Sequence, residues 1–347
     1  MTNRTVVPTN DIGILCGVAL MLIMGCVVLG SVGIPVFQSG TVLSSALLYL
    51  SSWIALFVGQ ISIGLWKHRP DSPIAYIRDH EFSPEYRRRL LHALPILLAL
   101  TVYMPMFSAF KSSIPLFNPF QWDQTFIAWD RAIFGQDAWL WMQPVLGYPV
   151  VTSIISIFYH LWILLLYVGS VYFAIYVTDK PLRQQYFMAY FLTWTIVGIA
   201  MATWLSSVGP CFLLPLTGDP AFIPQMEYLR AADQHYPVMV LPVQQALLDW
   251  QASGQFGLGR GITAMPSMHV AMVVLFWLGM RRISRLAGIA AAIFALIIAL
   301  GSVHLGYHYA VDGIVAAAVT LVIWPVAGWL STTRIGALQA GKPARSN

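Results

Sequence analysis

The residues best suited to chemistry lie near the C-terminal end of the chain, in His304-Leu305-Gly306-Tyr307-His308-Tyr309-Ala310-Val311-Asp312. His308 and Asp312 are four residues apart, so on a helix their side chains would share one face. A carboxylate beside an imidazole N–H fixes the tautomer of the ring and raises the basicity of its other nitrogen. The pair therefore predicts an activated imidazole.

A second group of candidate residues lies about 40 residues earlier, in Gly259-Arg260-Gly261-Ile262-Thr263-Ala264-Met265-Pro266-Ser267-Met268-His269. We expect a helix to begin here, with Pro266 and His269 in its first turn. The free N–H groups beside Ser267 would then form an anion site, and Arg260 could add a compensating cation. This segment predicts the binding of an anion next to a histidine.

Other uses of these side chains are open at this stage. Three ligands on two helices could hold zinc, although an arginine and a helix N-terminus favour an anion. His304 could orient a neighbouring group or contact a phosphate. His160 is expected to form a hydrogen bond between helices. Ser267 lies only two residues from His269, which is poor geometry for a serine nucleophile and its base.

The composition indicates the elements that must position these residues. The chain has 347 residues, of which 58% are hydrophobic and only 10% are charged, and its mean hydropathy is +0.70. Soluble domains carry roughly 25% charged residues. We therefore expect an all-α, polytopic integral membrane bundle. The net charge of +5 does not indicate nucleic-acid binding, because basic residues in such proteins mostly record topology.

Eight apolar segments are candidates for transmembrane helices. They lie at about 12–34, 42–66, 93–110, 150–176, 186–206, 267–280, 286–303 and 308–330. With the N-terminus inside, the inner segments hold 15 of the 19 Lys and Arg residues, and Lys111, Arg131, Arg230 and Arg260 lie outside. This asymmetry predicts that both termini are cytoplasmic. Asp312 is the only acidic residue within the eight segments, and an ionisable group at that depth is usually functional.

The connecting segments suggest two parts of the chain. Residues 1–92 would form two spans and a basic amphipathic surface helix over 78–92, and residues 93–347 a six-span catalytic domain. Residues 111–149 are rich in aromatics and are expected in the membrane interface. Residues 207–266 contain seven prolines and are expected to form an irregular cap over the outer face.

At the two histidine segments the chain resembles a known family. Pro266-Ser267-Met268-His269, followed by His308-Tyr309-Ala310-Val311-Asp312, is similar to the type 2 phosphatidic acid phosphatase superfamily. The His-Tyr-x-x-Asp form resembles the inositol phosphorylceramide synthase and sphingomyelin synthase branch of this superfamily. The chain therefore resembles a bacterial-type relative of that branch. The resemblance is specific over about 255–325 and weaker over Lys111 to Trp139. The usual family pattern has Gly where this chain has Met268, and Arg where it has Ser302, and its Lys-x6-Arg-Pro motif is missing.

The resemblance implies a mechanism and a site. His308 would attack phosphorus, Asp312 would orient it, and His269 would protonate the leaving oxygen and then deprotonate water or an alcohol. Arg260, Lys111, Ser267 and His304 would contact the phosphate, and no metal or other cofactor would be needed.

The implied function is that of a lipid phosphotransferase or phosphatase. It would act on a phospholipid or lipid phosphate at the outer face of a membrane. In bacteria, this would be the inner membrane, and the active site would face the periplasm. Oligomeric state is left open. The alternatives are a transporter, disfavoured by the almost purely apolar first five spans, and a metal-dependent membrane hydrolase.

Overall fold

A computed structural model describes residues 11–254 and 257–340, and within these ranges every regular element is helical. Seven helical segments are long and apolar enough to cross a membrane. They are α1 (Ile12–Ser31), α2 (Ser39–His68), α4 (Pro84–Phe117), the run α7 (Pro149–Leu164), η1 (Leu165–Gly169) and α8 (Ser170–Ile175), the run α9 (Lys180–Thr195), η2 (Ile196–Met201) and α10 (Ala202–Trp204), α15 (Arg285–His304) and α16 (Ala310–Ala340). The all-helical prediction is confirmed, and the composition of these segments indicates an integral membrane protein.

The expected sixth span is a shorter helix than the other seven. Helix α14 (Met268–Met280) has 13 residues, or about 20 Å at 1.5 Å per residue, whereas the hydrocarbon core is about 30 Å thick. It packs against α9, α15 and α16, and Ala271, Met272 and Leu275 are completely buried. Because its N-cap is Ser267, Pro266 precedes the helix and does not form its first turn as expected.

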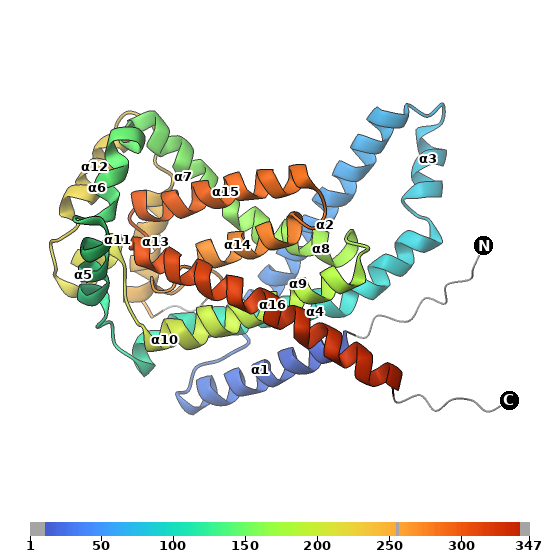
Figure 1. Cartoon of the computed structure of the whole chain (residues 1–347), viewed down its shortest axis with the longest axis horizontal. Coiled ribbons are helices and arrows are strands. Elements are labelled where there is room, and N and C mark those ends of the chain that lie inside the picture. The colour runs from blue at the N-terminus through green and yellow to red at the C-terminus, as the bar shows by residue number, and fades with distance from the viewer. Residues whose placement is uncertain (1–10, 255–256, 341–347) are drawn as a thin grey trace.

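Five shorter helices gather at one end of the bundle, at the left of Figure 1. They are α5 (Asp123–Phe134), α6 (Ala138–Leu146), α11 (Pro210–Thr217), α12 (Ile223–Asp233) and α13 (Val240–Ala252). Most prolines of 207–266 stand at or near helix starts, where a missing N–H costs nothing, so this segment is more regular than the sequence suggested.

The opposite end of the bundle differs from the prediction of a separate basic surface helix over 78–92. That stretch is divided between α3 (Pro73–His80) and the first turns of α4, which run without a break into the apolar part of the same helix. The predicted boundary between residues 92 and 93 therefore falls inside a helix.

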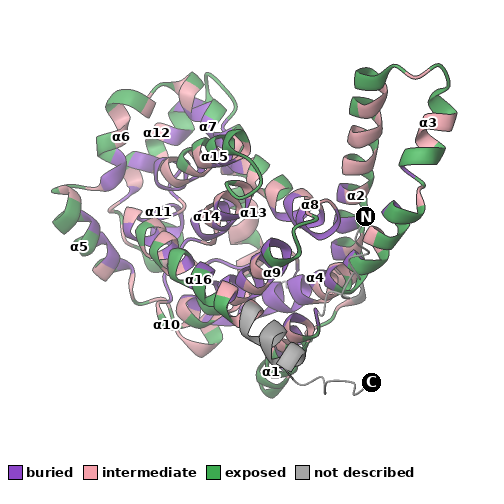
Figure 2. Cartoon of the chain, turned by 45° about the vertical axis from the view of Figure 1, so that its right-hand side comes forward, coloured by how far each residue is buried: buried purple, intermediate pink, exposed green. Residues whose placement is uncertain are grey.

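Burial separates a peripheral pair of helices from a central group (Figure 2). In α1 and α2 only 22% and 17% of the residues in an apolar 18-residue stretch of the helix are buried inside the protein, compared with 50% in α4 and in the α9 run. The outer pair packs on the rest through α1 against α4 and α9, and α2 against α4 and η1. Their exposed apolar side chains are those that a membrane would cover.

Candidate active site

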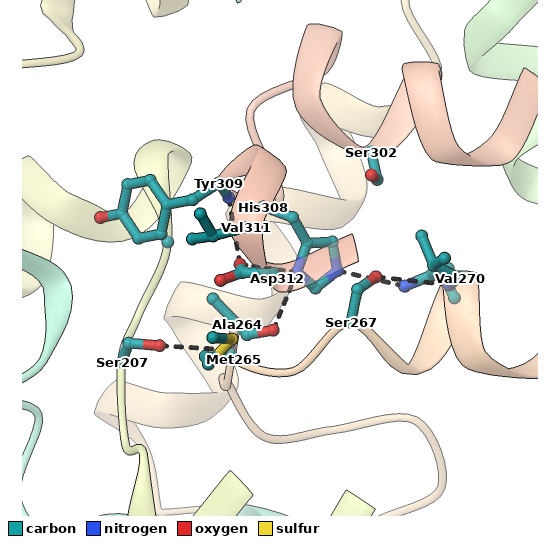
Figure 3. Close-up of polar contacts among 12 residues, drawn as sticks. Ser207, Ala264, Met265, Ser267, Val270, Ser302, His308, Tyr309, Val311 and Asp312 are labelled. Carbon is teal, nitrogen blue, oxygen red and sulfur yellow. Dashed lines mark hydrogen bonds and ion pairs between the residues drawn. The ribbon is translucent and has the colours of Figure 1, made fainter. Parts of the chain in front are cut away.

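The start of α14 places His269 and holds the loop before it. Ser267 caps the helix by accepting a hydrogen bond from the Val270 N–H at 3.4 Å, and its own N–H donates to the Asp312 carbonyl at 3.1 Å. The loop is fixed further back, where the Met265 N–H donates to the Ser207 hydroxyl at 3.1 Å. This end of α14 is thereby attached to the first turn of α16 (Figure 3).

His308 lies in the turn that joins α15 to α16. Gly306, with φ of +78°, allows the chain to reverse, and the His308 N–H donates to the Ser302 carbonyl at 3.0 Å. Because α16 begins at Ala310, His308 precedes the helix and does not share a helical face with Asp312 as expected. The two side chains meet because Asp312 reaches back, its Oδ2 accepting from the Tyr309 N–H at 3.0 Å.

The hydrogen bonds of His308 define its tautomer (Figure 3). Its Nδ1 lies 2.9 Å from the Ala264 carbonyl oxygen and 3.2 Å from Asp312 Oδ2. A carbonyl oxygen can only accept, so Nδ1 carries the proton and donates it. In the neutral ring the lone pair is then on Nε2, as a nucleophilic imidazole requires.

His269 faces this nitrogen. Its Nδ1 lies 3.5 Å from His308 Nε2, although the two residues are 39 positions apart. Its ring is held against the aromatic rings of Tyr159 and Trp162, with centroids at 4.6 Å and 4.4 Å. The structure thus brings His269, His308 and Asp312 into one cluster.

A cavity of about 340 Å³ opens on these two imidazoles, and the side chains that line it include Lys111 and Arg260. Arg260 also lies over the Trp250 ring, 4.5 Å from its centroid. His160 lines the same cavity, and its Nδ1 donates to the Ser156 carbonyl of its own helix at 2.9 Å, rather than to a neighbouring helix as expected.

One glycine allows the two cations to come together. Gly261 has φ of +90°, and a Cβ built there would lie 2.8 Å from the backbone N and Cα of Ser112. The loop that carries Arg260 therefore touches the backbone of α4 directly beside Lys111. A larger residue would separate the two segments, because backbone atoms cannot move aside as a flexible side chain can.

Two other predicted phosphate contacts lie elsewhere. Ser267 is completely buried as the cap of α14 and is not among the cavity-lining residues. His304 is also buried and outside the cavity lining. Its Nε2 lies 2.9 Å from the Thr152 hydroxyl, and its ring contacts Tyr228. His304 thus connects α15 to α7 and α12.

Two acids outside the predicted site hold the start of α16 and the loop beside it. Asp130 of α5 accepts from the Ala310 and Val311 N–H groups at 2.8 Å and 2.9 Å. It caps α16 from another helix, as an anion at a helix N-terminus can. The advance signals were its acidic character in an aromatic segment outside the spans and its place in the weaker family resemblance over Lys111 to Trp139.

Asp123 holds the neighbouring loop. It accepts from the Gly209 N–H at 3.0 Å and from the Tyr309 hydroxyl at 2.8 Å. Burial raises the pKa of both Asp123 and Asp130, and the bonded N–H groups oppose this shift. Both acids position the active-site turn without lining the cavity.

One family model matches this chain over more than half of its length. The family model described as the PAP2 superfamily matches residues 124–326. The chain belongs to the PAP2 superfamily. No curated protein and no solved structure matches it. The matched range includes His269, His308 and Asp312, whereas Lys111 lies before it.

Membership of the PAP2 superfamily indicates a membrane phosphatase or phosphotransferase. Ser302 stands where the family usually has arginine. Its carbonyl oxygen accepts two backbone N–H groups of the active-site turn, and its hydroxyl donates to the Ala299 carbonyl.

No group of three or more His, Cys, Asp or Glu side chains is placed to hold a metal ion in the part of the chain that the structure describes.

Proposed function

We propose that this PAP2 protein is a lipid phosphotransferase or phosphatase in which His308 forms a phosphohistidine. The observation that carries the proposal is the environment of His308. Its Nδ1 is held by the Ala264 carbonyl and Asp312, so the lone pair on Nε2 is directed toward the cavity beside His269. An oriented, basic imidazole next to a second imidazole is suited to covalent catalysis with acid–base assistance.

The phosphoryl group would lie between His308 and the two cations of the cavity. Lys111 on α4 and Arg260 on the loop before α14 line the same space. Both can donate charge-assisted hydrogen bonds to phosphate oxygens, and such bonds strengthen as negative charge develops in the transition state. The two side chains would supply the positive charge that an arginine usually supplies in this family at the position of Ser302.

His269 would act as the proton carrier. The 3.5 Å between His269 Nδ1 and His308 Nε2 is a contact distance without room for a phosphoryl group, so the bound substrate must part the two rings. His269 then donates a proton to the leaving oxygen as the His308 N–P bond forms. In the second step it takes a proton from the acceptor hydroxyl as that N–P bond breaks.

The remainder of the cavity supports a lipid substrate. Away from the cations its lining is mainly apolar, with Met104, Phe107 and Leu166 among its residues, and it extends to Leu48 on α2. Leu48 is 37% exposed on the side of the bundle, where a membrane would lie against it. An acyl chain could therefore extend from the phosphate toward the bilayer.

The distribution of basic residues supports an outward-facing site. Fifteen of 19 Lys and Arg residues lie in the segments assigned to the inner side, and the catalytic turn lies at the other ends of the same helices. We therefore propose cytoplasmic termini and, in a bacterial cell, a site open to the periplasm. The resemblance to the inositol phosphorylceramide synthase and sphingomyelin synthase branch favours transfer to an alcohol or lipid over transfer to water.

The test uses purified protein and a lipid phosphate labelled with ³²P. Label should become attached to the wild-type protein and be absent from His308→Ala, which should also lose turnover. Free phosphate as the product identifies a hydrolase, and a new labelled lipid after addition of an alcohol identifies a transferase. Full activity of His308→Ala would remove the covalent mechanism.

The cation assignment has its own test. Lys111→Met and Arg260→Met should each lower kcat/KM by about 10²–10³, the usual cost of losing one transition-state donor. Arg230→Met is the control, because Arg230 is an exposed cation of α12 outside the cavity lining. If both cavity variants matched this control, the phosphate would be held by other groups.

A further inference from the structure

A second cavity, of about 610 Å³, lies between the first turns of α4 and the junction of α8 with α9. Four cationic side chains line it, with Glu85 as the only acid. The cationic residues are Arg88, Arg89, Lys180 and Arg183. The volume is within the range of small-molecule sites, and none of these residues lines the catalytic cavity.

The cavity is at the opposite end of the bundle from the catalytic site. Arg88 and Lys111 are both on α4, 23 positions apart, which corresponds to about 35 Å along a helix. The hydrocarbon core of a bilayer is about 30 Å thick. The two cavities therefore belong to opposite membrane interfaces, and this one lies on the side with the excess of Lys and Arg.

Ion pairs inside the protein neutralise part of this charge. The buried Arg183 guanidinium bonds both carboxylate oxygens of Asp11, at 3.1 Å and 2.9 Å, and Arg89 pairs with Glu85. Arg88 is exposed and has no hydrogen bond or ion pair within the described part of the chain. After these pairings, the positive charge of the cavity exceeds its negative charge.

We propose that this cavity binds the phosphodiester headgroup of an anionic phospholipid. Basic pockets between transmembrane helices at the inner interface suit such headgroups. A lipid source for the phosphate is favoured by the next turns of α4, where Leu91, Leu94 and Leu98 are 69%, 46% and 56% exposed. Acyl chains can lie against these side chains while the headgroup enters the cavity. The bound lipid would join α4 to α8 and α9 without taking part in the reaction.

The adjacent arginines provide a matched test. Arg87 and Arg88 are both exposed on the first turns of α4, but only Arg88 lines the cavity. Arg88→Ala should weaken binding of a short-chain phosphatidylglycerol about five-fold, as expected for one interfacial cation. Arg87→Ala should leave binding within two-fold of wild type, and Arg88→Lys should restore most of it.

Binding is measured on the purified full chain in zwitterionic detergent, by native mass spectrometry and by the shift of the thermal unfolding midpoint. Phosphatidylglycerol should bind and raise the midpoint, whereas phosphatidylcholine and inorganic phosphate should not. Equal losses of binding in the Arg87 and Arg88 variants would show that diffuse surface charge attracts the lipid, and would overturn the proposed site. Saturation by inorganic phosphate would identify a soluble ligand instead. Catalytic turnover is not the readout, so the outcome is independent of the proposed reaction.

Discussion

Gly261 offers the sharpest test of how the active site is assembled. Replacement by Ala would place a Cβ 2.8 Å from the Ser112 backbone. Ordinary contact begins near 3.4 Å, so the loop would have to retreat from α4 by about 0.6 Å, and Arg260 would move with it. A misplacement of about 1 Å can cost 10²-fold in rate. We therefore expect Gly261→Ala to lower kcat/KM by about 10- to 100-fold.

The matched control is Gly259→Ala, on the other side of Arg260. Gly259 also has a positive φ, of +73°, but a Cβ there meets nothing within 4 Å. Both variants carry the backbone strain of a left-handed residue, of order 1–3 kcal/mol, and only Gly261→Ala adds the clash. Turnover of labelled lipid phosphate and thermal unfolding in detergent are measured for both. Equal activities in the two variants would show that contact between the loop and α4 does not position Arg260.

Three further predictions concern the residues around the site. Asp130→Ala should reduce the free energy of unfolding by about 1–3 kcal/mol, because it leaves two N–H groups unsatisfied, and it should slow turnover. The control Asp137→Ala loses a surface pair with Arg131 and should reduce the free energy of unfolding by about 0–1 kcal/mol. Equal losses in the two variants would contradict the capping role of Asp130. Ser267→Ala should cost about 0.5–2 kcal/mol as a lost N-cap and slow turnover without abolishing it, unlike His308→Ala. Turnover should survive EDTA, because His308 is the proposed nucleophile; loss in EDTA with recovery on adding a divalent ion would favour metal-dependent hydrolysis.

Composition and local spacing were enough to predict much of this protein. A chain with 10% charged residues can bury its backbone in a membrane only as helices or as a closed barrel. Runs of about 20 apolar residues, in place of short alternating segments, select helices and give the spans. The pairing of His308 with Asp312 was also predicted, but for a different reason than the structure gives. The two residues do not share a helical face, and they meet because Asp312, in the first turn of α16, reaches back to the turn before it.

Tertiary structure decided the features that depend on contacts between distant segments. Asp130 caps α16 across 180 residues, and the Ala264 carbonyl fixes the His308 tautomer across 44. Neither has a local signal, because any acid or any backbone carbonyl could serve. Ser267 and His304 show the converse, since both lie near the catalytic residues in sequence while their side chains bond away from the cavity. Sequence spacing constrains which residues are neighbours along one helix, but only packing determines which side chains share a cavity.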